Sequence, residues 1–185
     1  MFRLLFWGLM GGLVAVPLDA LHVVTGVLSY RDPVLGLQDW WVIPLFVSSG
    51  LLLGFSHRHI AVPLSAQQPA GVPLWAAGLG LCALVFAYAS SGVLQTWPVA
   101  ALAVYVGVFV VALVAVDRRA RSSLLLHGIG AAIVGPLVEI GISSTGAFSY
   151  AHPDVAGVAL WLPGIYLNAA VASHLMDRHL LARGI

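Results

Sequence analysis

The sequence contains few charged residues and no lysine at all. Charged residues make up 8% of the 185 positions, whereas an ordinary soluble domain has about a quarter. Hydrophobic residues make up 61%, and the mean hydropathy is +1.00. This composition excludes a soluble fold and indicates helices that cross a lipid bilayer. The formal net charge of +1 and the lack of a basic run give no reason to expect a nucleic-acid partner.

Cysteine and the familiar motifs of soluble enzymes are also scarce. The single cysteine, Cys82, excludes an intrachain disulfide and a cysteine metal site. The sequence has no HExxH helix, phosphate-binding loop, dinucleotide glycine motif or serine nucleophile elbow. The polar residues at the inner ends of the second and sixth apolar runs do not have a specific metal-site spacing: His57, His59, Asp177 and His179. We therefore expect no catalytic residue, no metal and no cofactor.

Six apolar runs predict an all-α, polytopic membrane protein, a six-transmembrane-helix bundle in one domain of residues 1–185. All eight basic residues are arginine, a bias typical of a GC-rich bacterial genome, so we expect the bacterial plasma membrane, or the endoplasmic reticulum if the source is eukaryotic. With both termini in the cytoplasm, seven of the eight arginines lie on the cytoplasmic side and only Arg31 lies outside. The predicted spans lie near residues 4–29, 41–56, 72–94, 98–116, 123–143 and 157–176.

Two pairs of glycines are spaced for close helix packing. Gly8 and Gly12 lie four residues apart in the first span, and Gly50 and Gly54 do so in the second. Small residues at this spacing let helix backbones approach each other in a membrane. The pairs predict helix contacts within the protomer or between protomers, and we expect a homo-oligomer.

Three ionisable residues inside the predicted spans are candidates for function, because charged groups in a bilayer usually face a partner or a cavity. Asp19 and His22 lie on one face of the first helix, within reach of each other. They form either the polar end of a ligand cleft, an acid–base couple, or a buried packing pair. Glu139 follows Pro136, whose kink suggests a cavity. The alternative for Glu139 is a protonated acid bonded to a neighbouring helix.

Aromatic residues form two groups. Most tryptophans fall near the ends of the predicted spans, as an interfacial aromatic belt requires. Phe86, Tyr88 and Tyr105 lie deeper, in the third and fourth spans, where they either line a lipid pocket or simply pack.

Three ordered landmarks resemble the Insig family (insulin-induced gene proteins). Residues 40–44 (Trp-Trp-Val-Ile-Pro), with Arg-His at 58–59, resemble the Insig pattern that runs from Trp-Trp-Val-Pro to Asp-Arg-His. Residues 116–122 are similar to the Insig Phe-Asp-Arg-Ser-Arg-Ser segment. Residues 146–154, which end in His-Pro-Asp, are followed by Trp-Leu-Pro at 161–163, at the interval seen in Insigs. The resemblance covers roughly residues 1–180.

The resemblance implies a lipid-binding bundle with six spans and both ends inside. Insigs are lipid sensors that bind oxysterols within the membrane and then hold partner membrane proteins. Asp117 occupies the position of the Insig aspartate associated with binding the partner Scap, so it is the candidate partner contact here. The alternative for Asp117 is a residue that only ends a helix in an arginine-rich turn.

We therefore expect an Insig-like protein that binds a sterol or another small-headed neutral lipid in an intramembrane cleft, as a sensor or regulator, with a membrane-protein partner of unknown identity. The alternative is an intramembrane isomerase or cyclase for an isoprenoid or sterol-like lipid, with Glu139 or Asp19 as acid and His22 as base. A transporter is a third possibility, although paired interrupted helices are missing. The expected lipid-binding residues are Asp19, His22, Phe86, Tyr105 and Glu139.

Overall fold

The computed structural model describes residues 2–65 and 70–184, and it describes side chains from Leu5 onward. Met1, residues 66–69 and Ile185, which belong to the expected 1–185 domain, lie outside the described residues. Within the described ranges the helices form six continuous helical segments, which confirms the predicted helical membrane bundle. The single-domain assignment stays a prediction.

The first and second segments each contain a π-helical turn, that is, a turn wider than an α-helix. In the first, Pro17 has no N–H for the carbonyl one turn earlier, which favours a wide turn there. The first segment consists of α1 (Phe2–Met10), η1 (Gly11–Ala15) and α2 (Val16–Val24). The second consists of α3 (Val42–Ser56), η2 (His57–Ala61) and α4 (Val62–Leu64).

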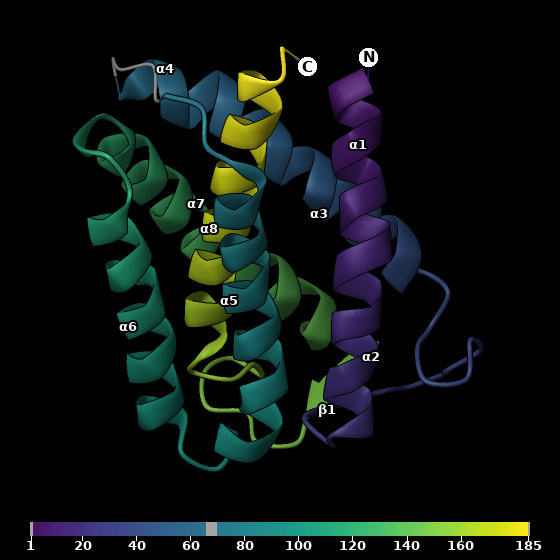
Figure 1. Ribbon diagram of the computed structural model, residues 1–185. Helices are drawn as coiled ribbons and strands as arrows, with labels where there is room; N and C mark the ends of the chain where they lie inside the picture. The colour runs from purple at the N-terminus through teal and green to yellow at the C-terminus, as the bar shows by residue number, and fades with distance from the viewer. Residues whose placement is uncertain (1, 66–69, 185) are drawn as a thin grey trace.

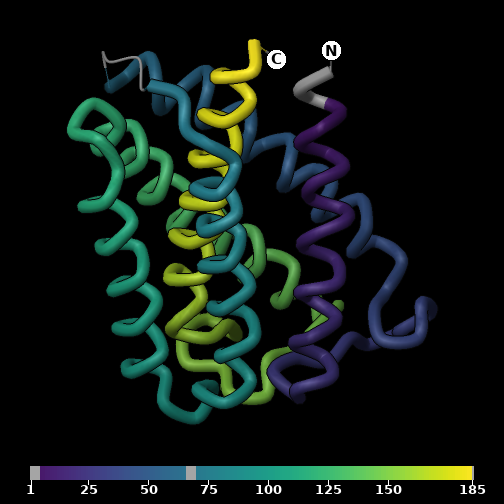
Figure 2. The backbone as a smooth tube through the Cα atoms, viewed as in Figure 1, coloured from purple at the N-terminus to yellow at the C-terminus, as the bar shows by residue number. Residues whose placement is uncertain are grey.

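Each of the other four segments is one α-helix, and α8 lies at the centre of the bundle (Figure 1). α8 packs against α5, α6 and α7, while α1 packs on α3. The backbone trace in Figure 2 shows the same arrangement. The four helices are α5 (Leu74–Leu94), α6 (Pro98–Ala115), α7 (Arg118–Ser144) and α8 (Leu162–Ala182).

The two ends of the bundle differ. Both chain termini lie at one end, which we call the terminus end (Figure 1). The opposite end, the strand end, carries the antiparallel strands β1 (Leu28–Tyr30) and β2 (Phe148–Tyr150), in which Leu28 pairs with Tyr150. An even number of crossings brings the termini to one side, and which side of the membrane this is stays a prediction.

Four described segments are long and apolar enough to cross a membrane by length and composition: Leu5–Val24, α5, α6 and α7. The α-helical part of α3 has only 15 residues, because η2 interrupts it. α8 has 21 residues but carries Asp177 and Arg178, both of which are buried. A helix surrounded by other helices does not need a fully apolar surface, so α8 spans the bundle without the hydropathy of a lipid-facing helix.

Several helix ends differ from the limits of the apolar runs. α2 ends at Val24, before the expected limit at residue 29, because Gly26 adopts a positive φ of 71° and the chain turns into β1. α7 begins at Arg118, before the expected limit at 123, because Asp117 caps it: its carboxylate accepts a hydrogen bond from the Ala120 N–H at 3.1 Å.

Glycines place α1 and α3 in backbone contact. A Cβ added to Gly50 would lie 2.2 Å from the Trp7 carbonyl oxygen, and one added to Gly11 would lie 2.0 Å from the Phe46 carbonyl oxygen. Gly54 makes room for the Trp7 ring in the same way. The predicted close packing at Gly50 and Gly54 is therefore present within the protomer. In α1 and η1 the closest approach occurs at Gly11, rather than at the expected Gly8 and Gly12.

Candidate functional site

A cavity lies among α1, η1, α3, α5 and α8, all of which contribute side chains to its wall. Its empty volume is about 810 Å³, open space at its mouth included. Its wall consists largely of apolar side chains and of the glycines at the α1–α3 crossing, Gly11 and Gly50. The crossing that sets the distance between α1 and α3 therefore also sets the width of the cavity.

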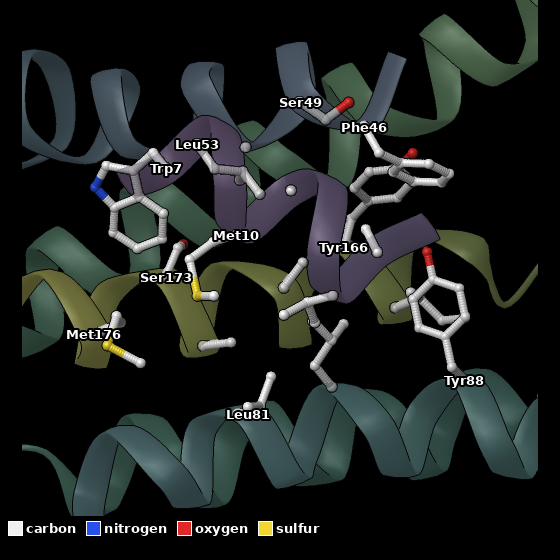
Figure 3. A pocket seen from close by; sticks show the side chains of 18 residues that line it. Trp7, Met10, Phe46, Ser49, Leu53, Leu81, Tyr88, Tyr166, Ser173 and Met176 are labelled. Carbon is white, nitrogen blue, oxygen red and sulfur yellow. The ribbon is translucent and has the colours of Figure 1, made fainter. Parts of the chain in front are cut away.

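The two ends of the cavity differ in polarity. Trp7 and Met176 lie at one end of the cavity in Figure 3, and Tyr88 and Tyr166 lie at the other. Tyr88 is near the end of α5 and Tyr166 near the start of α8, so both tyrosines lie toward the strand end of the bundle. The cavity thus has an apolar body and one end with two phenols.

Tyr88 is one of the two residues with a phenol hydroxyl at this end of the cavity (Figure 3). In the part of the chain that the structure describes, this hydroxyl makes no hydrogen bond, and the side chain is only partly buried. The ring is held from behind by His22, whose ring stacks on it with centroids 4.5 Å apart. His22 is fixed in turn by Ser91, since its Nε2 lies 2.8 Å from the serine Oγ. The Tyr88 hydroxyl is therefore a positioned polar group with no hydrogen-bond partner among the described residues.

Tyr166 is held by the acid that the sequence singled out. The Tyr166 hydroxyl donates to Glu139 Oε1 at 2.7 Å, and the Tyr150 hydroxyl donates to Glu139 Oε2 at 2.6 Å. Gly135 lies under the Tyr166 ring, where a Cβ would be 2.2 Å from a ring carbon. Glycine at this position lets the tyrosine cross α7 and reach Glu139. Glu139 thus fixes a cavity-lining phenol.

Asp19 is buried and also binds a tyrosine. The Tyr30 hydroxyl donates to Asp19 Oδ2 at 2.6 Å, and the Gln38 amide donates to the same oxygen at 2.7 Å. Burial, followed by the nearby Asp19 carboxyl, raises the pKa of Tyr30 above its ordinary value, so its hydroxyl remains a donor. Asp19 and His22 are both buried but have different partners, so the expected contact between them is not among those the structure describes.

Phe86 and Tyr105 lie elsewhere. Phe86 is on the exposed side of α5. Tyr105 is fully buried in the core between α6 and α8, packs over Gly164, and shares a hydrogen bond with Ser90. The side chains of the five residues expected to bind lipid do not form the described cavity wall. Asp19, His22 and Glu139 instead support the strand end of the bundle, and their assignment to a lipid site stays a prediction.

A second polar cluster joins η2, α7 and α8 near the terminus end. His57 is fully buried, with its Nδ1 3.2 Å from Asp177 Oδ2 and its Nε2 2.8 Å from His174 Nδ1. His127 Nε2 lies 2.8 Å from Oγ of Ser173, which lines the cavity. The sequence indicated that His57 and Asp177 lie near each other, whereas His127 and His174 read only as polar residues inside the spans that interhelical hydrogen bonds could satisfy.

His59 and His179, the other two polar residues noted at the inner ends of the second and sixth apolar runs, do not join this cluster in the described structure. His59 is exposed and stacks on Phe55, and His179 lies 3.1 Å from the Val72 carbonyl oxygen. Across residues 2–65 and 70–184, no three ligand-type side chains are arranged to hold a metal ion.

Asp117 has two structural contacts. Besides capping α7, it forms an ion pair with Arg178 of α8, and Arg178 also donates to the Ala70 carbonyl at 2.6 Å. Arg178 is almost completely buried, whereas the Asp117 side chain is 41% exposed. Asp117 therefore ties α7 to α8, and Arg178 ties α8 to the segment before α5, while part of the Asp117 carboxylate remains at the surface.

Comparison with known proteins gives a consistent result. No family model matches the chain. An INSIG protein homologue from Mycolicibacterium vanbaalenii is 29% identical over 190 residues, which cover 95% of this chain and 85% of that protein. A crystal structure of the Insig homologue MvINS from Mycobacterium vanbaalenii has a TM-score of 0.79 at 26% identity. A cross-linked MvINS trimer has a TM-score of 0.80 at 25% identity. Both structural matches cover 99% of this chain and 96% of the other chain.

Proposed function

We propose that this chain, an Insig homologue in sequence and in fold as its motifs predicted, binds one small-headed and otherwise apolar lipid in its cavity. The lipid is a sterol or a neutral glyceride whose hydroxyl bonds to Tyr88 and whose apolar body extends toward Trp7. The observation that carries this proposal is that Tyr88 lines the cavity (Figure 3) while its hydroxyl has no hydrogen-bond partner among the described residues.

The shape and polarity of the cavity support this class of ligand. A binding site for a small molecule is usually concave and apolar, with a few polar groups that fix the orientation of the ligand. Here the polar groups at the strand end are phenols, and the carboxyl group of Glu139 is already occupied by Tyr150 and Tyr166. A neutral hydroxyl group on a lipid can form a hydrogen bond with a phenol. A charged phosphate headgroup would meet two phenols and no arginine at this end of the cavity wall.

In this proposal Asp19, His22 and Glu139 do not contact the lipid themselves but hold other residues in position. His22 orients the Tyr88 ring by stacking, and Glu139 orients the Tyr166 hydroxyl. Asp19 holds the chain that follows β1. Each of these polar groups is thereby satisfied away from the lipid, which avoids the cost of an unpaired polar group in a membrane.

The test compares Tyr88→Phe with Tyr105→Phe. Both variants remove one phenol oxygen from a bundle helix, but only Tyr88 lines the cavity. Lipid that copurifies with the protein is identified by native mass spectrometry, and the affinities for cholesterol and for a diglyceride are measured by competition. Loss of one hydrogen bond should weaken binding by about two- to tenfold in Tyr88→Phe and should leave Tyr105→Phe unchanged. No specific lipid and no competition by either compound would sink the proposal.

A cavity-filling variant tests the site independently of hydrogen bonding. Ala169 of α8 lines the cavity, and Ala169→Phe places a ring inside it. This variant should lose the bound lipid while α8 keeps its contacts with α7. A variant that folds normally and still carries the lipid would place the lipid elsewhere.

A sensor role follows if lipid occupancy changes helix packing. Gly11, Gly50 and Trp7 both line the cavity and form the α1–α3 crossing. A lipid that fits better with one distance between α1 and α3 would shift the population toward that arrangement. Asp117, whose carboxylate is partly exposed, is the proposed contact for a membrane-protein partner of unknown identity.

We also propose that the chain forms a homotrimer, because the related MvINS has been crystallised as a cross-linked trimer. Native mass spectrometry in detergent should then give three times the chain mass of 19.4 kDa. The arginine distribution supports cytoplasmic termini in a bacterial plasma membrane. A C-terminal green fluorescent protein fusion should fluoresce, and a C-terminal alkaline phosphatase fusion should be inactive.

A further inference from the structure

The segment between β1 and α3, residues 31–41, projects from the side of the bundle (Figures 1 and 2). Its charged residues lie at the two stems, Arg31 and Asp32 on one side and Asp39 on the other. Its tip contains no charge, and four large apolar side chains are between 43% and 64% exposed: Val34, Leu35, Leu37 and Trp40. An apolar tip on charged stems is unusual for a loop in water.

The structure holds this segment firmly in place. Gln38 is buried, and its amide donates to Asp19 Oδ2 at 2.7 Å and to the Val16 carbonyl at 3.0 Å. The tip closes on itself through a hydrogen bond from the Leu35 N–H to the Gln38 carbonyl at 2.9 Å. Gly36 has a positive φ of 79°, which the tight turn requires. Tyr30, on the other stem, binds the same Asp19 oxygen. The segment is therefore a fixed projection.

The anchor at Val16 sets the depth of the projection in the membrane. Val16 is the first residue of α2, which ends at Val24. At a rise of 1.5 Å per residue, its carbonyl lies about 12 Å below the strand end of that helix. Figure 1 likewise shows the projection beside α2 and the start of α3, and not beyond them. Leu5–Val24 is long and apolar enough to span a membrane, so a bilayer that surrounds this span would also reach the tip.

The exposed side chains also continue the exposed surface of α3. Trp40 lies three residues before Ile43, and both are exposed, so they share one side of the start of α3. A stable protein interface uses about 20–30 residues from each partner, far more than the four apolar side chains here. Tryptophan is the residue most typical of the membrane–water interface.

We propose that residues 33–37 and Trp40 insert into the membrane interface of the leaflet at the strand end, as a short lipid anchor that Asp19 and Gln38 hold in position. The partner is therefore the bilayer itself. This inference is separate from the proposed cavity ligand, since none of these side chains lines the cavity wall.

The test uses the single cysteine of the chain. In a Cys82→Ser background, Leu35→Cys and Leu37→Cys are labelled with the fluorophore NBD, and Asp32→Cys serves as the control on the charged stem. Each protein is placed in vesicles of phosphatidylcholine and phosphatidylglycerol. NBD at positions 35 and 37 should emit at shorter wavelength than at position 32 and should be quenched by lipids with a spin label near the headgroup. Aqueous iodide should quench position 32 severalfold more strongly than positions 35 and 37.

Two results would overturn the proposal. Equal quenching by iodide at positions 32, 35 and 37 would place the tip in water. Protection from both iodide and spin-labelled lipid, together with a disulfide between two copies of Leu35→Cys, would place the tip against a second copy of the chain. Size-exclusion profiles matching that of the unsubstituted protein confirm that each labelled variant is folded.

Discussion

Replacing Gly50 by alanine directly tests the contact between α1 and α3. The added Cβ would lie 2.2 Å from the Trp7 carbonyl oxygen and 2.9 Å from the Gly11 Cα, whereas carbon atoms pack at about 3.5–4.0 Å. Both obstacles are backbone atoms, so no side-chain rotation relieves the clash. α1 has to move away from α3 by roughly 1 Å or more, and the contact between the two helices opens.

Two effects with opposite signs determine how much Gly50→Ala changes the free energy of unfolding. Overpacking of a tight contact costs about 1–3 kcal/mol, and a backbone clash belongs at the upper end. Alanine gains up to about 1 kcal/mol over glycine in a helix interior. We therefore expect Gly50→Ala to be destabilised by about 2 kcal/mol on balance. Gly107 of α6 is the matched control, because a Cβ added there meets nothing within 4 Å.

The free energy of unfolding is measured by titrating sodium dodecyl sulfate into detergent micelles while tryptophan fluorescence is recorded. Gly50→Ala should unfold at a lower dodecyl sulfate fraction than the unsubstituted protein, and Gly107→Ala at the same or a slightly higher fraction. Equal midpoints for the two variants would refute the close crossing. Gly50→Ala should also change lipid binding, since Gly50 lines the cavity, and Gly107→Ala should not.

Three further substitutions test separate contacts. In Gly135→Ala the added Cβ would lie 2.2 Å from the Tyr166 ring, so the ring should be displaced from Glu139. This variant should therefore weaken lipid binding more than it lowers stability. Unchanged affinities in the competition assay with cholesterol and the diglyceride would contradict this prediction. Asp117→Asn should lower the free energy of unfolding by about 1 kcal/mol, because the ion pair of Asp117 with Arg178 is partly exposed. Hydrogen exchange should also accelerate in the first turn of α7, which Asp117 caps. His57→Leu should lower the free energy of unfolding by about 2–4 kcal/mol, because it removes the two buried hydrogen bonds that His57 makes with Asp177 and His174, as measured by the dodecyl sulfate titration.

The membrane architecture was predictable because it depends on patterns that a sequence states directly. Apolar runs give the helices, and the Trp-Leu-Pro at 161–163 lies where α8 begins, since Pro163 suits the first turn of a helix. The limits of α2 were less predictable. Thr25, Gly26 and Val27 continue the apolar run, and only the positive φ of Gly26 turns the chain into β1. Hydropathy therefore locates a span but does not locate its last turn.

The cavity wall was much harder to predict from the sequence. Leu81 and Leu84 line it, while Leu79 and Val85 of the same helix are exposed on its outer side. In a membrane protein both faces of such a helix are apolar, so periodicity does not distinguish a pocket from the lipid surface. The sequence instead singled out Asp19 and Glu139, because charges in a membrane are rare and costly.

The positions of these carboxyl groups bear on how a site in a membrane can select a ligand. A lipid that leaves the bilayer for an apolar cavity gains little from the hydrophobic effect, because lipid tails are as apolar as leucine. Affinity and selectivity must therefore come from shape and from hydrogen bonds that the bilayer core does not offer. In the proposed site Tyr88 and Tyr166 would provide these groups, and Glu139 holds Tyr166 in place. If this is correct, Tyr88→Phe should narrow the difference in affinity between cholesterol and its hydrocarbon analogue cholestane, whereas Tyr105→Phe should preserve it.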